Sequence, residues 1–533
     1  MRLIFLCLTL FCSLFLFSPY AQETVRSVDK TTSSSLLEPT DFYKKNSIPL
    51  SLQQVIFKTL GNNLQIRISD YNRRIAEAEI MVQKGIFDLI LNANLSAYNN
   101  EYQQPIYDNM HREIVAKDKK YGADAALSQL IPTGGVLGFG YYTNRYGTNS
   151  IAVDISPYYT QGGRLFFRQP LLKNFGSYMT LSGIRIAQNS ALQSREAFRF
   201  MVQDQIAEVT KAYWNLVSAI KTYEVQCLTL YQARDFLRIT TVSYKTGVVP
   251  ESDVLQAKAQ VAEREENVIT AESSIKAMED QLKIFMNIPR ADKEWEQFYL
   301  PTDEPDVHEI PLDANSFIET AFNSRPDYMQ MQIDLKNKQI ARNVARNRRL
   351  PELNLTGSAG RSGLGESHSD AWHELNTYDY HNYEVGLELE FPLQNRAARY
   401  RYKQAILQYE KSELTLKNLE NLIILEIRNA VRNIQTDLKR VAATQATVEA
   451  EKAKLDSEFQ RYRVGLSTSF NVLTFQKDYA EGLMHLIQSK ISFNQDLIEL
   501  ERAKGTLLSK FGINHVPSVD LTLEPVSLKN VQE

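Results

Sequence analysis

The feature that most limits the possible folds is a proline-free stretch from Leu172 to Val249 with a regular apolar repeat. Its apolar side chains recur at alternating spacings of three and four residues, which is the pattern of a coiled-coil seam. A continuous helix of roughly 65 residues would be about 100 Å long, because each residue adds about 1.5 Å. No compact globular domain contains such a helix. The seam comprises Ile206, Val209, Tyr213, Leu216, Ile220, Tyr223, Cys227 and Leu230, and a later seam comprises Ile427, Val431, Ile434, Leu438 and Val441.

Both long helical segments are interrupted by a glycine. The segment SYKTGVVPESDVL (243–255) contains Gly247, and RYRVGLSTSFNVL (461–473) contains Gly465. Tyr, Gly, Val and Leu occupy matching positions in the two segments, and each matched pair is 218 residues apart. Glycine leaves the right-handed helical conformation at little cost, so each break is predicted to be the turn of a helical hairpin.

The matching breaks belong to an internal two-fold repeat. LILNANLSA (89–97) resembles PELNLTGSA (351–359), and RLFFRQPLL (164–172) resembles GLELEFPLQ (386–394). Each copy therefore has the order helix, strand, strand, long helix, glycine break, helix. The offset falls from 262 to 222 residues between the two strands, so the first copy has extra residues there. A Pro-Thr-Gly-Gly turn between two strand-like runs in residues 126–147 predicts an additional hairpin.

The predicted strands alternate between apolar and polar residues. Val385, Leu387 and Leu389 fall on one face, whereas Glu384 and Glu388 fall on the other. A half-buried sheet in a soluble protein has this pattern, and so does a transmembrane barrel strand. The four conventional strands of one chain cannot close a barrel, because small barrels need about eight strands. Open sheet edges are not tolerated in lipid, so in a membrane several chains would have to share one barrel.

The organisation of the chain follows from these elements. Residues 1–21 contain one Arg, an apolar run and a small-residue end, as in a secretory signal peptide. The run is shorter than the ~20 residues of a membrane anchor, which is the alternative. Without these residues Cys227 is the remaining cysteine, which suits an exported bacterial envelope protein. The further predicted segments are an N-terminal extension (22–49), a first repeat (50–288), a proline-rich linker (289–312), a second repeat (313–512) and a C-terminal tail (513–533).

Composition and motifs argue against several functions. The 60 basic and 63 acidic residues nearly balance, so bulk electrostatics do not favour a nucleic-acid partner. No nucleophile, base and orienting group stand at a recognisable spacing, so neither an enzyme nor a cofactor is expected. His368, His373 and His381 lie close together in the sequence. Metal binding would need convergent geometry, and a polar loop is the simpler interpretation.

Four features together resemble the TolC family of outer-membrane efflux proteins: the repeat, the QPLL and FPLQ strand ends, RPDY at Arg325 and VGLS at 464–467. The resemblance covers about residues 50–512. It implies an α+β membrane protein, a homotrimer with a shared outer-membrane β-barrel of about 12 strands. A long α-helical coiled-coil tunnel would continue the barrel through the periplasm. The implied function is a passive duct for substrates delivered by an inner-membrane transporter and a periplasmic adaptor protein.

The resemblance assigns a role to the glycine breaks. In the family, the hairpin tips meet the adaptor. The alternative is that the same residues only cap helical hairpins, but the apolar side chains of Val248 and Leu466 would then face water without a partner. The candidates for adaptor contact are Tyr244, Gly247, Val248, Tyr462, Val464, Gly465, Leu466 and Ser467.

Family members close the tunnel just inside the tips with acidic residues and hydrogen bonds. Asp253 stands at this place in the first copy, and Asn471 and Thr474 stand at the matching positions of the second copy. The best-known members have aspartates there, so this departure favours a gate of neutral hydrogen bonds in the second copy. For Asp253 the alternative is an ordinary helix N-cap beside Pro250.

Charged residues on the strands would line the barrel lumen. They would either bias the passage of ions or pair across strands. A function of another class is a periplasmic coiled-coil scaffold or rod whose strands form a soluble sheet. A scaffold has no need for duplicated strands with one apolar face, so the channel is the leading hypothesis. The lumen candidates are Arg164, Arg168, Glu384, Glu388 and Glu390.

Overall fold

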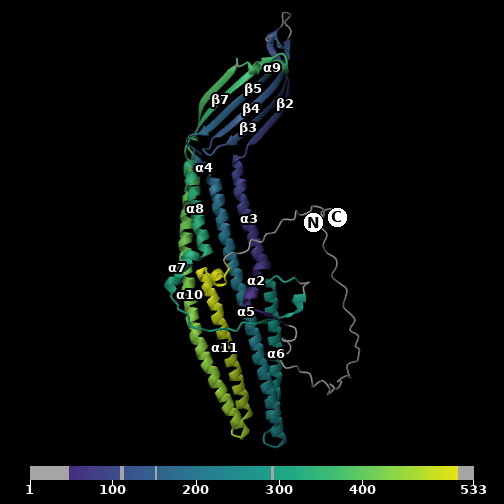
Figure 1. Ribbon diagram of the computed structural model, residues 1–533, viewed down its shortest axis with the longest axis vertical. Coiled ribbons are helices and arrows are strands. Elements are labelled where there is room, and N and C mark those ends of the chain that lie inside the picture. The colour runs from purple at the N-terminus through teal and green to yellow at the C-terminus, as the bar shows by residue number, and fades with distance from the viewer. Residues whose placement is uncertain (1–46, 108–112, 151–152, 290–292, 378, 514–533) are drawn as a thin grey trace, which may run out of the picture. The chain divides into compact units, whose positions relative to one another are not determined.

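Two long helices account for a quarter of the chain. In the computed structural model, α5 (Ser182–Lys245) has 64 residues and α10 (Arg396–Arg463) has 68 residues. Both helices run from a β-sheet towards the hairpin turns (Figure 1). The structure describes residues 47–107, 113–150, 153–289, 293–377 and 379–513. The predicted signal peptide, the N-terminal extension up to residue 46 and the tail beyond residue 513 lie outside the described residues.

The predicted coiled-coil seams form the helical core. Along its buried side, α5 packs against α6 (Glu251–Phe285) and α11 (Ser469–Lys504). On the other hairpin, α10 packs against α11 through a cluster that includes Ile427, Ile434 and Phe493. Among the described helices, none has both the length and the apolar character needed to cross a bilayer. The seam residues of α5 that are fully buried are Ile206, Val209, Tyr213 and Leu216.

Each long helix ends at a glycine in the left-handed conformation. Gly247 has a φ of 74° and Gly465 has a φ of 75°. The next amide, of Val248 or Leu466, donates to the carbonyl five residues earlier at 2.9 Å or 2.8 Å. This Schellman arrangement satisfies helical carbonyls that would otherwise lack a donor. The predicted helical hairpins are therefore confirmed at both breaks.

Four helices lie side by side next to the sheet. Their order is α3 (Leu64–Lys84), α5, α8 (Pro326–Asn347) and α10. The first strand of the sheet follows α3 and its last strand precedes α10, so these two helices form the edges of the layer (Figure 1). The shorter helices are α2 (Leu52–Asn62), α4 (Ser177–Thr180), α7 (Ala314–Ser324) and α12 (Leu507–Lys510).

The sheet is antiparallel, with its described strands hydrogen-bonded in the order β2-β3-β4-β5-β7-β8 (Figure 1). At the place of the predicted insertion, β3 and β4 form a hairpin around residues 131–135. This hairpin is a part of the sheet, because β3 pairs with β2 and β4 pairs with β5. The strands are β2 (Ile90–Tyr107), β3 (Glu113–Leu130), β4 (Val136–Thr148), β5 (Tyr158–Pro170), β7 (Glu352–Gly365) and β8 (His381–Glu390).

The two faces of the sheet differ in polarity. Every strand pair joins odd-numbered residues with odd and even with even, so the odd positions of the whole sheet share one face. The predicted alternation therefore continues from edge to edge. One odd row across the sheet is Leu91, Leu127, Phe139, Leu165, Ala359 and Tyr383. The adjacent even row is Asn92, Ala126, Gly140, Arg164, Gly360 and Asn382.

The β2–β3 hairpin extends beyond the apolar band. Towards its tip, odd positions are occupied by Asn99, Glu101, Lys117 and Lys119. The Lys117 ammonium lies 3.2 Å from the Glu101 carboxylate. The outer part of this hairpin is therefore polar on the face that is apolar nearer the helices.

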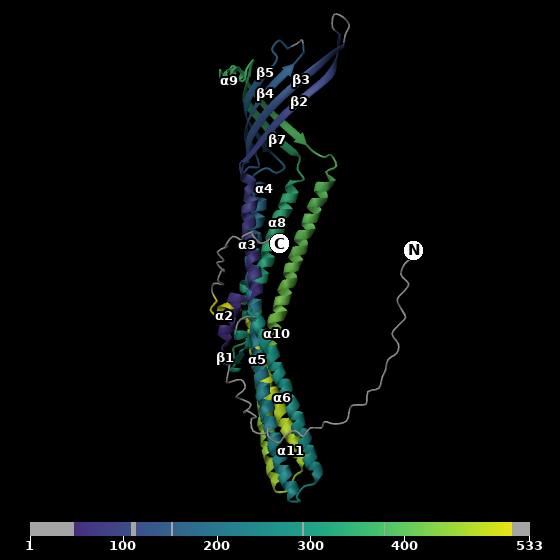
Figure 2. The same cartoon turned by 90° about the vertical axis from the view of Figure 1, so that its right-hand side faces the viewer.

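A short helix, α9 (His368–Asn376), lies on the odd face of the sheet (Figure 2). It approaches β7 closely at Gly363, where a Cβ would lie 2.1 Å from the carbonyl oxygen of Ala371. The Gln161 side chain donates to the His368 carbonyl at 2.8 Å. Trp372 packs edge-on to Tyr141. The sequence predicted only a polar loop here.

A small parallel strand pair attaches the proline-rich linker to α5. In this pair, β6 (Phe298–Pro301) of the linker lies beside β1 (Ser47–Leu50) of the N-terminal extension. The Asp303 carboxylate accepts hydrogen bonds from the Leu52 amide at 2.8 Å and the Tyr213 hydroxyl at 2.5 Å. Burial and the bond to Asp303 raise the pKa of Tyr213, so its hydroxyl remains a donor.

Two aspartates face each other between α10 and α11. Asp437 is buried, and the Arg440 guanidinium forms an ion pair with its Oδ1 at 3.0 Å. Its Oδ2 is buried and has no hydrogen-bond partner among the described groups. Burial, with Asp437 nearby, raises the pKa of Asp496 to about 7. The two carboxyls can therefore share one proton, which would satisfy Oδ2.

This pair predicts a pH dependence of stability. In the unfolded chain Asp496 titrates near 3.8, so the folded chain binds the proton more tightly. Stability should therefore decrease as the pH rises from about 4 to about 7. We expect Asp496→Asn to be more stable than wild type at pH 8, with a much smaller difference at pH 5. Thermal unfolding followed by helical circular dichroism measures this, with the exposed Asp456→Asn as control. Equal shifts for both variants would contradict the shared proton.

The left-handed turns predict opposite effects for two glycine substitutions. Gly465→Ala should destabilise the second hairpin by about 1 kcal/mol, because an L-residue is strained at this φ. Gly482, inside α11, would place a Cβ 3.5 Å from Val448, an ordinary contact. Gly482→Ala should therefore stabilise the hairpin by about 0.5–1 kcal/mol. Amide hydrogen exchange near residues 455–480 measures both, and changes of the same sign would refute the argument.

Candidate functional site

The ends of the two helical hairpins expose apolar side chains. Val248 is 71% exposed and Leu466 is 70% exposed, and Val464 and Tyr244 are also exposed. Gly247 and Gly465 lie in the turns, and Ser467 is half-buried beside them. Apolar side chains concentrated at a hairpin end are costly in water unless a partner covers them. Seven of the eight predicted contact residues thus lie at or beside the surface of the tips.

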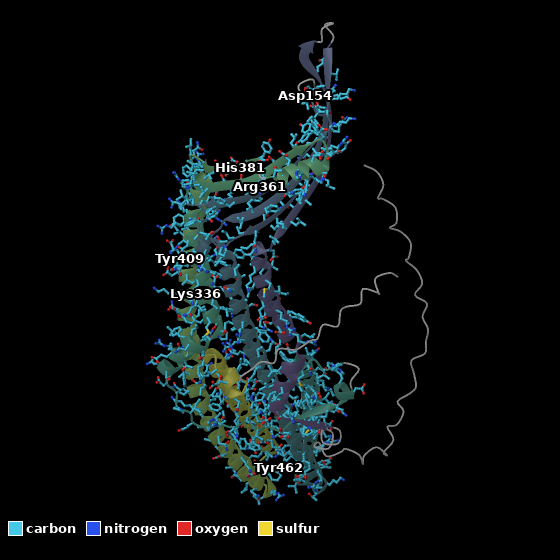
Figure 3. All side chains as sticks on the ribbon, turned by 45° about the horizontal axis from the view of Figure 1, so that its top comes forward. Asp154, Lys336, Arg361, His381, Tyr409 and Tyr462 are labelled. Atoms are coloured by element: carbon cyan, nitrogen blue, oxygen red, sulfur yellow. The ribbon has the colours of Figure 1, made fainter. Side chains whose placement is uncertain are left out.

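Tyr462 is the exception, because it is buried. Its ring packs against Phe236 at a centroid distance of 5.2 Å, within a cluster that includes Val472 and Leu473. Figure 3 labels Tyr462 near the end of the helices remote from the sheet. The expectation that its side chain contacts an adaptor directly is therefore corrected. It lies beneath the tip and not on its surface.

Just above the tips, a series of polar side chains joins the four helices of the two hairpins, which are α5, α6, α10 and α11. The Ser469 hydroxyl of α11 donates to Asp253 of α6 at 2.7 Å. It also lies 3.3 Å from the Tyr462 hydroxyl of α10, which lies 3.4 Å from Thr240 of α5. Ser469 and Thr240 are almost fully buried. Buried polar groups are costly when unpaired, so this network, Asp253–Ser469–Tyr462–Thr240, favours one arrangement of the two hairpins.

The structure decides how Asp253 is used. Pro250 is the N-cap residue of α6, and no side chain caps this helix. The Asp253 carboxylate instead reaches Ser469 of the other hairpin. The N-cap alternative is therefore wrong, and Asp253 links the two hairpins, which are 216 residues apart in sequence at this contact.

The two second-copy gate candidates have different surroundings. Asn471 donates to Glu458 at 3.3 Å, and Ser467 donates to the same carboxylate oxygen at 2.5 Å. The bond from Ser467, with the charge of Arg461, lowers the pKa of Glu458. Thr474 donates only to the Phe470 carbonyl of its own helix among the described contacts. The structure therefore places Asn471 in a second polar cluster and leaves Thr474 outside both.

Sequence reasoning missed Ser469, Thr240 and Glu458. Ser469 belongs to a Ser-Thr-Ser run before a helix, which is ordinarily interpreted as capping, and Thr468 is indeed the N-cap. Thr240 occurs in the interior of a helix, where a threonine in the sequence does not indicate a functional contact. Only the packing of the two hairpins shows that these hydroxyls meet.

The five predicted lumen residues all lie on the even, polar face of the sheet. Arg168 lies 2.9 Å from Glu388 on β8 and also contacts Glu352. This is the cross-strand pairing that the sequence left open for these residues. Glu390 lines a cavity of about 510 Å³ between sheet and helices, together with Lys173 and Arg401.

The histidines of residues 367–383 are separated by the fold. His368 and His373 belong to α9, whereas His381 begins β8 and pairs with Arg361 (Figure 3). Within the part of the chain that is described, no three His, Cys, Asp or Glu side chains gather as metal ligands would.

Comparisons with known proteins agree with this architecture. The chain matches the family Outer membrane efflux protein over residues 55–287 and 317–506. Outer membrane protein TolC of Salmonella enteritidis is 24% identical over 454 residues, which cover 80% of this chain and 87% of that protein. The TolC protein of Escherichia coli (strain K12) is 24% identical over 428 residues, with coverages of 76% and 81%. The Campylobacter jejuni CmeC outer membrane channel matches in structure with a TM-score of 0.64 at 16% identity, over 96% of this chain and 99% of that one. The resemblance found in the sequence is confirmed, and the chain belongs to the outer membrane efflux protein family.

Proposed function

We propose that three copies of this outer-membrane efflux channel form one passive duct in a tripartite export system. An inner-membrane transporter would deliver the substrate, and a periplasmic adaptor would join the transporter to the helical tips. The family is one of transport channels and not of enzymes. The observation that carries the trimer is the sheet, which has one apolar face and two open edges.

The odd face of the sheet would contact lipid. Its side chains Leu91, Leu95, Val385, Leu387 and Leu389 are all largely exposed in the single chain. Transmembrane barrel strands carry such an outward apolar band and a polar interior. The even face, with Arg168 and Glu388, would then line the lumen. A periplasmic scaffold or rod is surrounded by water and gains nothing from this apolar band, so the channel is favoured over the scaffold.

The tips would combine adaptor contact with closure. The exposed residues Tyr244, Val248, Val464 and Leu466, with Gly247, Gly465 and Ser467, would form the adaptor-binding surface. Beneath them, the network through Asp253 and Ser469 would hold the hairpins in the closed arrangement, with Asn471 in the neighbouring cluster. Among the described contacts of Thr474, the bond to the Phe470 carbonyl of its own helix does not support a role in the gate. Opening would separate the hairpins and break the bond between Asp253 and Ser469.

Loss of the network should open the duct. A hydrogen bond to a charged group contributes about 1.5–3 kcal/mol, so Ser469→Ala should raise the open fraction on the order of tenfold to a hundredfold. Tyr462→Phe, which keeps the ring packing, should have a smaller effect in the same direction. Planar-bilayer recording of the purified protein measures both, with Thr474→Ala as control. Channels that stay as closed as wild type in Ser469→Ala would refute the gate, and a folded protein without any conductance would refute the duct.

Adaptor contact predicts position-specific cross-linking in cells. A photoreactive residue in place of Val248 or Leu466 should give a product with one periplasmic protein that has its own helical hairpin. The control position is Tyr231, which is equally exposed but lies about 25 Å up α5. The same product from all three positions, or none from the tips, would argue that these residues only cap the hairpins.

A further inference from the structure

The additional hairpin is built into the middle of the sheet. Its strands are paired on both sides, and Gln129 of β3 donates to the Phe87 carbonyl at 2.8 Å. At its turn, the Thr133 carbonyl accepts a bond from the Gly176 amide at 2.9 Å. The hairpin is therefore fixed at the level where strands become helices. The open edges of the sheet are β2 and β8.

Each open edge continues into a helix with an exposed apolar stripe. On α3, which precedes β2, the stripe follows coiled-coil spacing, and Ile75 is 67% exposed. On α10, which follows β8, Tyr400, Leu407 and Leu414 are exposed at intervals of seven residues. Leu407 and Leu414 also line a shallow groove of about 450 Å³. The stripe on α3 consists of Leu64, Ile68, Tyr71, Ile75 and Val82.

We infer that these edges bind each other: β8 and α10 of one copy pair with β2 and α3 of the next, and three copies close a barrel of eighteen strands. This inference rests on the proposed trimeric duct and changes its dimensions, because the resemblance alone implied about 12 strands. An even number of strands per chain places the descending β8 beside the ascending β2. The antiparallel alternation therefore continues across the junction between copies.

The widths of the two layers support this number. Six strands about 4.8 Å apart, tilted by about 40°, occupy roughly 38 Å of circumference per chain. The four helices α3, α5, α8 and α10, about 9 Å apart, occupy roughly 36 Å. Four strands would occupy only roughly 25 Å. An eighteen-stranded barrel thus fits a twelve-helix tunnel without a change of radius.

The register follows from the ends of the elements. β2 begins at Ile90 and β8 ends at Glu390, so Leu91 should lie opposite Leu389 and Ala93 opposite Leu387. Within one chain, Leu91 is level with Tyr383. The resulting shift of six residues, about 20 Å across about 29 Å of sheet, corresponds to a strand tilt of about 35°, as barrels require. All these pairs join odd positions, which keeps the apolar face continuous.

The same alignment brings the helical stripes together. Counting down from the strands, Val82 lies level with Tyr400, Ile75 with Leu407 and Ile68 with Leu414. These are three consecutive pairs at seven-residue spacing, as in an antiparallel coiled coil. The register set by the strands thus also aligns the apolar stripes of the two helices.

Paired cysteines test the inference in the full-length protein in outer membranes. In a Cys227→Ser background, Ala93→Cys with Leu387→Cys should form disulfides between copies under mild oxidation, giving bands up to the trimer. Pairs shifted by two residues map the register. Asn92→Cys with Leu387→Cys is the matched control, because these side chains point to opposite faces, and it should cross-link at least about tenfold less.

Two further pairs separate the possible failures. Phe139→Cys with Leu387→Cys joins β4 to β8, which requires β2 and β3 to leave the barrel. Cross-linking of this pair in place of the β2 pair would overturn the eighteen-stranded barrel and favour a narrower one. Ile75→Cys with Leu407→Cys, joined by a short bifunctional maleimide, reports the helical interface alone. If this pair yields trimers and no strand pair does, the barrel inference fails and the trimer stands. If neither yields trimers and the detergent-solubilised protein is monomeric, the proposed trimer itself fails.

Discussion

A strand edge inside a lipid bilayer has no water to satisfy its amide and carbonyl groups, and each unsatisfied group costs several kcal/mol. The sheet of this chain has a continuous apolar face and ends in two such edges, β2 and β8. The requirement to pair them acts on everything attached to the sheet. In the proposed trimer it would make α3 and α10 neighbours of the next copy. Through α5 and α10 it would also determine the positions of the hairpin tips, which lie at the end of the helices remote from the sheet.

The tips have a different balance of forces. Their cluster around Phe236, Tyr462 and Val472 is small, and polar groups are buried within it. Thr240 donates to the Phe236 carbonyl of its own helix, and it is linked to Ser469 through Tyr462 of α10. Ser469 in turn donates to Asp253 of α6. Such a network is stable in one arrangement and loses most of its bonds in any other. Structure of this kind suits a closure that must be both specific and reversible, whereas apolar contacts such as those of Ile206, Val209 and Leu216 in α5 suit permanent packing.

Periodic features of the sequence predicted most of the fold. The apolar seam of α5, the glycine turns and the faces of the strands depend on local spacing, and local spacing decides them. The features that were not predicted depend on contacts between distant segments. The bond from Ser469 to Asp253, the burial of Tyr462 and the pairing of β1 with β6 have no local signature. The raised pKa of Asp496 also arises only when α10 and α11 are packed, because burial and the nearby Asp437 cause it. In the candidate site, exposed tip residues were therefore found from the sequence, but the network beneath them was not.

The β3–β4 hairpin has an evolutionary consequence. In the proposed trimer β8 of one copy meets β2 of the next in antiparallel orientation, so a chain of this architecture would gain or lose strands only two at a time. In a trimer each such event changes the pore by six strands. A single duplicated or deleted hairpin would thus change the diameter of the barrel pore in one large step. The helices, the tips and their partners would keep their sequences. Strands added to the middle of the sheet also leave the edge strands β2 and β8 unchanged. A pore of new diameter could therefore arise while the interface between copies is kept.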